Sequence, residues 1–88
     1  MKEKIHIGKL IKEKMKEEGR KSTWLANKIS CDKSNITRIF QRQNIDTELL
    51  ANISICLETD FFIHYSAYLN EKLERKHNKI TNFEQFLL

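Results

Sequence analysis

The chain has 88 residues, no proline and two glycines, and its 16 Lys and Arg against 12 Asp and Glu give a net charge of +4. A chain this short holds one modest core, which excludes a multi-domain enzyme, and so few turn residues disfavour a compact β-sandwich. The longest uncharged run, residues 61–70, is too short for a membrane span of roughly 20 residues, and no signal peptide is visible, so we expect a cytoplasmic protein with no membrane partner.

The first predicted helix runs from Ile5 or Ile7 to Glu18, where apolar residues recur at three- and four-residue spacing. Gly19 closes it, because glycine accepts the left-handed conformation that a helix C-terminus favours. Gly8 stands in the first turn, where glycine is unfavourable. It indicates either close backbone packing or a later helix start.

Two short helices are predicted next. The first begins near Ser22 or Thr23, either of which can cap it, and ends at residues 30–31. Asp32 is expected to cap the second, residues 33–41, by accepting hydrogen bonds from its first free amides. The outward side chains of this second helix are polar and carry two cations: Lys33, Ser34, Thr37, Arg38 and Gln41.

A fourth helix follows a loop at residues 42–46, is capped by Asp46 or Thr47 and reaches Leu57. Residues 58–60 form a break, and an amphipathic helix then continues to about Lys76. The tail, residues 80–88, is apolar enough to require a surface. We divide the chain into a domain at residues 1–70 and a C-terminal helical extension and tail at residues 71–88.

The basic charge is concentrated in the half of the chain that holds the two short helices. Residues 1–44 have a net charge of +7 and residues 45–88 a net charge of −3. Two short helices joined by a tight turn in a basic region are typical of a helix-turn-helix. Ala26 supplies the small residue that a close helix crossing needs, Ser30 the turn residue, and Cys31 the apolar plug. Solvated helix faces are the alternative interpretation of the charge.

Residues 22–40, STWLANKISCDKSNITRIF, resemble the helix-turn-helix of the phage repressor and Cro class, also called the XRE family. Residues 7–19 resemble that family's first helix, and residues 45–62 its fourth helix and the start of its fifth. The resemblance covers about residues 5–70. It implies an all-α, five-helix lambda-repressor-like helix-turn-helix domain, here with an extended C-terminal helix and tail. It also implies a sequence-specific, repressor-like regulator that binds double-stranded DNA.

The chain departs from the family at several positions. Ser30 stands where the family usually has Gly, Cys31 where it has Val or Ile, and Ser22 where Gln often contacts a phosphate. Many members pair an arginine of the first helix with a glutamate at the end of the recognition helix. Met15 and Phe40 occupy those positions, so we expect a packing contact in place of an ion pair.

The resemblance also implies which side chains contact DNA. Base edges would be read by Lys33, Ser34, Thr37 and Arg38, since cations donate to guanine and hydroxyls bond to either base. Phosphate contacts would come from Ser22, Thr23, Lys21, Lys28, Arg42, Gln43 and Asn44. Ordinary solvation is the alternative for each of these side chains.

The aromatic C-terminal half is expected to form a homodimer. The predicted dimerisation residues are Phe62, Tyr65, Leu69, Leu73, Phe83 and Phe86. A tail that folds back on its own monomer is the alternative. An apolar tail would also suit a protein partner, and a protein-interaction module, antitoxin or adaptor on the same fold is therefore the second functional hypothesis.

No catalytic cluster, cofactor motif or metal-ligand spacing is visible, so neither an enzyme nor a cofactor nor a metal is expected. Cys31 and Cys56 lie among apolar neighbours, which favours buried reduced thiols. Trp24 is expected to cover part of the core rather than to stack on bases.

Overall fold

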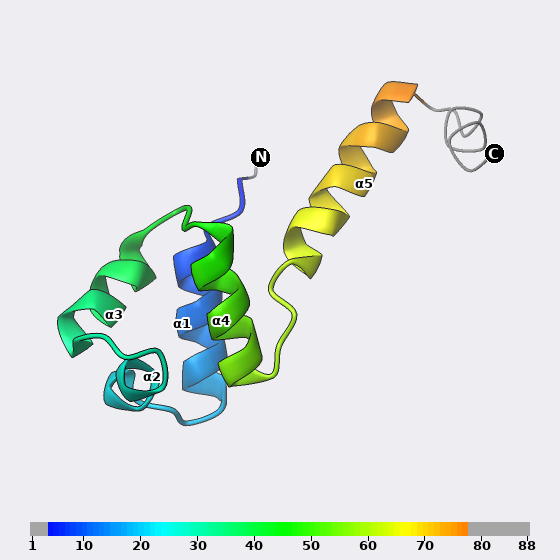
Figure 1. Ribbon diagram of the computed structural model, residues 1–88. Helices are drawn as coiled ribbons and strands as arrows, with labels where there is room; N and C mark the ends of the chain where they lie inside the picture. Colours follow the sequence, from blue (N-terminus) through cyan, green and yellow to red (C-terminus); the bar gives the residue numbers. More distant parts are fainter. Residues whose placement is uncertain (1–3, 78–88) are drawn as a thin grey trace.

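The computed structural model describes residues 4–77, and all of the regular secondary structure within them is helical (Figure 1). The helices are α1 (Ile7–Glu17), α2 (Ser22–Lys28), α3 (Lys33–Gln41), α4 (Thr47–Leu57) and α5 (Ile63–His77). The predicted all-α, five-helix architecture is confirmed. The expectations for the tail, with Phe83 and Phe86, fall outside the described residues. No helix of residues 4–77 combines the length and the apolar character that a membrane crossing requires.

A single hydrophobic core joins α1, α2, α3 and α4. Its buried side chains are Ile7, Ile11, Met15, Leu25, Ala26, Ile36, Ile39, Leu50, Ile53, Leu57 and Phe61. Apart from Phe61, these residues stand at helical spacing in the sequence, so the predicted stripes of α1, α2, α3 and α4 face inward. No polar or charged residue is buried within the described part of the chain. The folded state therefore rests mainly on the removal of apolar surface from water.

Gly8 marks a close approach between the start of α1 and the end of α3. The amide of Ile7 donates to the carbonyl of Gln43 at 3.0 Å, and the amide of Gly8 donates to the carbonyl of Arg42 at 3.0 Å. A Cβ at Gly8 would lie 2.5 Å from the carbonyl oxygen of Phe40. Of the two interpretations of Gly8, close backbone packing is the correct one. Gly19 has a φ of +69°, as its predicted role at the end of α1 requires.

Two predicted helix caps differ from the structure. Lys21 is the N-cap of α2, and it makes no side-chain capping bond. Ser22 and Thr23 therefore lie inside the first turn rather than before it. Asp32 is the N-cap of α3, but its backbone carbonyl, not its carboxylate, accepts from the amide of Asn35 at 2.9 Å. These short helices begin without a side-chain cap because tertiary packing, rather than local capping, determines where they start.

The cap of α4 is the predicted one, and α5 leaves the body of the molecule after a sharp break. Asp46 Oδ1 accepts from the amide of Leu49 at 2.7 Å. Glu58 ends α4 in the left-handed conformation, with a φ of 50°. Asp60 Oδ1 then accepts from the amide of Phe62 at 2.9 Å. From this point α5 extends away from α1–α4 without a break at position 70 (Figure 1).

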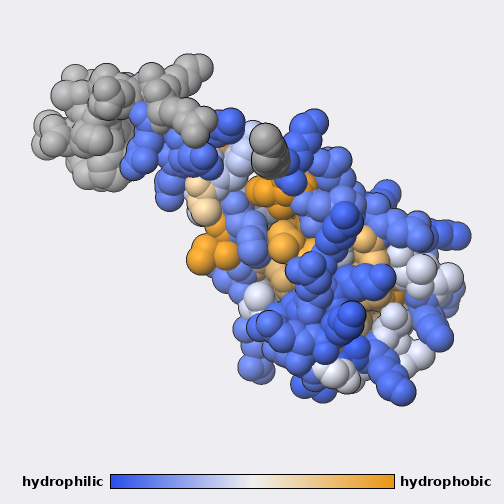
Figure 2. All heavy atoms as spheres, turned by 180° about the vertical axis from the view of Figure 1, so that it is seen from behind, coloured by the Kyte–Doolittle hydropathy of each residue, from blue (hydrophilic) through white to orange (hydrophobic). Residues whose placement is uncertain are grey.

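The exposed part of α5 carries apolar side chains. Phe62 and Tyr65 are half-buried and pack against the core, and burial raises the pKa of the Tyr65 hydroxyl. Leu69 and Leu73, one and two turns further on, are 53% and 50% exposed. Figure 2 shows apolar surface gathered where α5 leaves the body, on a face that is otherwise mostly hydrophilic. The helix is thus anchored at one end and carries exposed apolar side chains further along, at Leu69 and Leu73.

Candidate nucleic-acid interface

A compact turn at residues 29–32 joins α2 to α3. The amide of Cys31 donates to the carbonyl of Ala26 at 2.9 Å, and Ala26 itself is only 4% exposed. Ser30 has a φ of 57°, a left-handed conformation that a residue with a Cβ adopts at a cost. Glycine, which has no Cβ, would adopt this conformation at Ser30 without that cost.

The two faces of α3 differ completely in exposure. Ile36 and Ile39 are buried, with 0% and 5% exposure. The four side chains predicted to read bases are all exposed: Lys33, Ser34, Thr37 and Arg38. Their recorded bonds are local and weak, since Thr37 Oγ1 donates to the carbonyl of Lys33 at 3.5 Å and Arg38 Nη1 donates to Asn35 Oδ1 at 3.3 Å. The outer face of α3 is therefore a solvated donor surface on a helix that the core holds in place.

The predicted phosphate contacts lie around this face. Ser22 is half-buried, and the other six are exposed: Lys21, Thr23, Lys28, Arg42, Gln43 and Asn44. The carbonyls of Arg42 and Gln43 accept the bonds from α1 described above. The backbone of this loop is thus fixed while its side chains remain in solvent.

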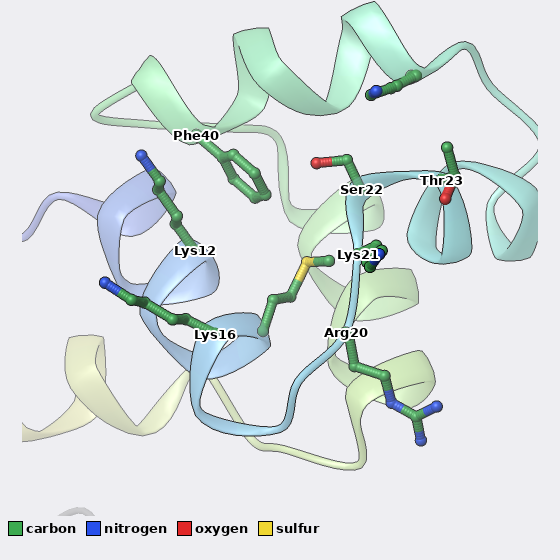
Figure 3. A pocket seen from close by; sticks show the side chains of 9 residues that line it. Lys12, Lys16, Arg20, Lys21, Ser22, Thr23 and Phe40 are labelled. Carbon is green, nitrogen blue, oxygen red and sulfur yellow. The ribbon is translucent and has the colours of Figure 1, made fainter.

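A pocket of about 430 Å³ opens between α1, the start of α2 and α3 (Figure 3). It brings together Lys21, Ser22, Thr23 and Lys33 from the predicted set, whereas Lys28 and residues 42–44 lie elsewhere. It also includes three cations that the sequence analysis missed, Lys12, Lys16 and Arg20. Lys12 and Lys16 are four residues apart on α1, and this helical spacing was the only signal of their common face.

Met15 and Phe40 form the apolar part of the pocket lining. Met15 is 2% exposed, and half-buried Phe40 packs against the core cluster to which Met15 belongs. The two residues thus share one environment, as the hypothesis of a packing contact in place of the family's ion pair requires.

Trp24 covers part of the core, as expected. It is half-buried and packs against the core cluster. The guanidinium of Arg20 lies 4.2 Å from the centre of its ring and the ammonium of Lys28 5.8 Å from it. Both distances are within the range of a cation–π interaction, so the ring already has partners.

The two cysteines are free thiols that are half-buried rather than fully buried. Cys31 Sγ donates to the carbonyl of Asp32 at 3.5 Å. Burial, with a smaller contribution from the charge of Asp32, raises the pKa of the Cys31 thiol. The expectation of buried thiols was too strong for Cys31, because its plug position lies in a surface turn.

The chemistry of this surface is that of donors and positive charge. The predicted base and phosphate contacts include no carboxylate, and the pocket lining includes none either. Such a surface can bind an anion. Comparisons of the chain with protein-family models, with curated proteins and with solved structures find no match.

Proposed function

We propose that the protein is a sequence-specific DNA-binding regulator, of the repressor-like kind, that inserts α3 into the major groove. The observation that carries the proposal is the outer face of α3, where two cations and two hydroxyls are exposed on a helix fixed by Ile36 and Ile39. An α-helix about 10–12 Å across fits a major groove about 12 Å wide. Lys33 and Arg38 would donate to guanine, and Ser34 and Thr37 would bond to either base.

Phosphate contacts would hold the helix in register on the duplex. Lys21 and Lys28 flank α2 and Arg42 follows α3, and all three are exposed. Ser22, Thr23, Gln43 and Asn44 supply neutral donors near the same helix ends. Contacts of this type set orientation and carry little sequence information. The net charge of +7 on residues 1–44 suits such a role.

The partner of the protein in this function would be a second copy of itself. The exposed stripe of Leu69 and Leu73 on α5 offers an apolar surface for this contact. A dimer of helix-turn-helix domains reads two half-sites about 34–36 Å apart. The operator would then be palindromic.

The test is binding to duplexes selected from a random pool, followed by fluorescence anisotropy over a range of salt concentrations. The double variant Lys33→Gln/Arg38→Gln should bind the selected duplex at least about tenfold more weakly, since each lost base contact costs about 1–3 kcal/mol. The control is Lys14→Gln/Lys72→Gln, which removes the same charge from two lysines that lie outside α3 and the pocket. Equal losses in both variants would contradict a reading role for α3.

A protein-interaction module, such as an antitoxin or adaptor, is the second candidate. The apolar side chains exposed on α5 favour it. It predicts duplex binding that is weak, insensitive to substitutions at Lys33 and Arg38, and almost independent of salt, whereas neutralisation of several phosphates gives a steep salt dependence.

A further inference from the structure

The pocket between α1, α2 and α3 is lined by positively charged residues that no sequence motif indicates. Lys12 and Lys16 line it from α1, Arg20 and Lys21 from the loop before α2, and Lys33 from the first position of α3. The ammonium groups of Lys12 and Lys16 point outward on one side of the pocket, and the guanidinium of Arg20 points outward on the other (Figure 3). Lys12 and Lys33 are 21 positions apart in the sequence, and only the packing of α1 against α3 brings them to one site. All five side chains are exposed, and the guanidinium of Arg20 also lies against the ring of Trp24.

Within residues 4–77, these cations lack carboxylate partners. Glu17 and Glu18 form salt bridges with Lys14, at 3.4 and 3.5 Å. Lys14 does not line the pocket. Glu17 and the C-cap residue Glu18 thus pair with a lysine outside the pocket and not with its cations. Gathered like charges repel one another, and a multiply charged anion would relieve that repulsion.

The remaining lining identifies the kind of anion. The hydroxyl of Ser22 points toward the ring of Phe40, and both residues line the pocket with Lys12 and Lys16 (Figure 3). Hydroxyls and cations together suit phosphate oxygens, which accept several hydrogen bonds at once. Met15 and Phe40 give the pocket an apolar wall that would receive the sugar or base attached to a phosphate. The volume of about 430 Å³ falls in the range of small-ligand sites.

We infer that this pocket is a phosphate-binding site that extends the cationic surface onto α1. Because Lys21, Ser22 and Lys33 belong both to the pocket and to the proposed DNA contacts, a backbone phosphate beside the recognition helix would occupy it in the DNA complex. The occupation of the pocket by a DNA phosphate rests on the proposed function. The phosphate site itself does not, since a free phosphorylated compound presents the same oxygens.

The first experiment titrates the full-length protein with inorganic tripolyphosphate at low salt. Trp24 is the sole tryptophan, and Arg20, which lines the pocket, lies 4.2 Å from its ring, so its fluorescence should report binding. Calorimetry on the same samples detects binding that leaves the fluorescence unchanged. The variant Lys12→Gln/Lys16→Gln should weaken binding about tenfold, as expected for two lost exposed charge contacts. The control Lys14→Gln/Lys72→Gln should stay within about twofold of wild type.

The second experiment measures the salt dependence of duplex binding for the same variants. Lys12→Gln/Lys16→Gln, with α3 intact, should reduce the slope of log affinity against log salt by about 1, and the control should not. Binding of tripolyphosphate with an unchanged slope would reject DNA as the source of the phosphate while supporting the pocket. A wild-type protein that binds no duplex would refute the proposed function. The tripolyphosphate titration would still show whether the pocket binds phosphate. If neither ligand distinguishes the two variants, the phosphate site is overturned.

Discussion

The amide of Gly8 donates a hydrogen bond to the carbonyl of Arg42 at 3.0 Å, which ties the first turn of α1 to the residue that follows α3. The neighbouring amide of Ile7 is bonded to Gln43 in the same way. Helix N-termini leave amides without partners inside the helix, and here the loop after α3 satisfies two of them. This pair of bonds fixes the C-terminal end of α3 against α1.

Replacing Gly8 by Ala should therefore be severe. A Cβ would meet three carbonyl oxygens, two of them at 2.5 and 2.6 Å, so the backbone of α1 must move away from α3. We expect the free energy of unfolding to fall by about 3 kcal/mol, in the range of strongly disruptive substitutions. Urea denaturation followed by circular dichroism measures this. Gly19→Ala is the control, because it meets no atom within 4 Å and should cost only about 1 kcal/mol for its left-handed φ. Equal losses would contradict the close approach.

Replacing Ser30 by Gly should stabilise the protein. A left-handed non-glycine residue destabilises the folded state by about 1–2 kcal/mol, and Gly removes this strain. The greater freedom of Gly in the unfolded chain offsets about 0.5–1 kcal/mol of that gain. The expected gain is about 0.5–1 kcal/mol in thermal or urea denaturation. Ser34→Gly, the same substitution inside α3, should instead lose about 0.5 kcal/mol. A gain at Ser34, or a loss at Ser30, would contradict the assigned turn conformation.

A double-mutant cycle can test the packing of Met15 against Phe40. Met15→Ala removes a side chain that is 2% exposed and should cost about 2–4 kcal/mol. Phe40→Ala should cost less than a fully buried Phe would, because Phe40 is only half-buried. Residues in contact show a coupling energy of about 0.5–3 kcal/mol in such a cycle. Costs that add to within about 0.3 kcal/mol would reject the contact.

The apolar stripe of α5 should control self-association. Leu69→Ser/Leu73→Ser changes two residues that are 53% and 50% exposed, so the stability of the α1–α4 body should change by less than about 0.5 kcal/mol. Sedimentation equilibrium should shift from dimer to monomer. A wild-type chain that sediments as a monomer would exclude the dimer.

The Cys31 thiol should react slowly near neutral pH. Its pKa is raised by burial and, to a smaller extent, by Asp32, and only the thiolate is a good nucleophile. In a Cys56→Ser background, the midpoint for iodoacetamide alkylation should lie above the ordinary thiol value, and Asp32→Asn should lower it slightly. Because folding raises this pKa, the stability that the neutral thiol contributes is present below the ordinary value and is lost as pH rises through the folded value. A midpoint below the ordinary value would contradict the assignment.

Local sequence was sufficient for the helices and their inward faces. The spacing of Ile7, Ile11 and Met15 marked α1, and Leu50, Ile53 and Leu57 marked α4, because each stripe repeats within a single helix. Asp46 was identified as a cap because its carboxylate reaches an amide only three residues away. Properties that depend on neighbours within a few positions are visible in a sequence.

Features that depend on contacts between distant segments were not predictable. Gly8 left two interpretations open, because the carbonyls that decide between them belong to residues 39–42. Lys12 and Lys16 were not predicted as pocket residues, because only the packing of α1 against α3 brings them and Lys33 to the same pocket. The cap of α2 was placed one or two residues late, because a hydroxyl at Ser22 or Thr23 offers a bond that the folded chain does not use.

The division of α3 into separate inner and outer residues has an evolutionary consequence. Ile36 and Ile39 hold the helix to the core, and none of the four outer positions shares that task. Substitutions at exposed helical positions usually change stability by less than about 0.5 kcal/mol. The outer face can therefore accumulate changes almost without penalty to folding. If α3 reads DNA as proposed, a lineage would exchange one target for another through a few single-residue steps, each passing through a stable protein.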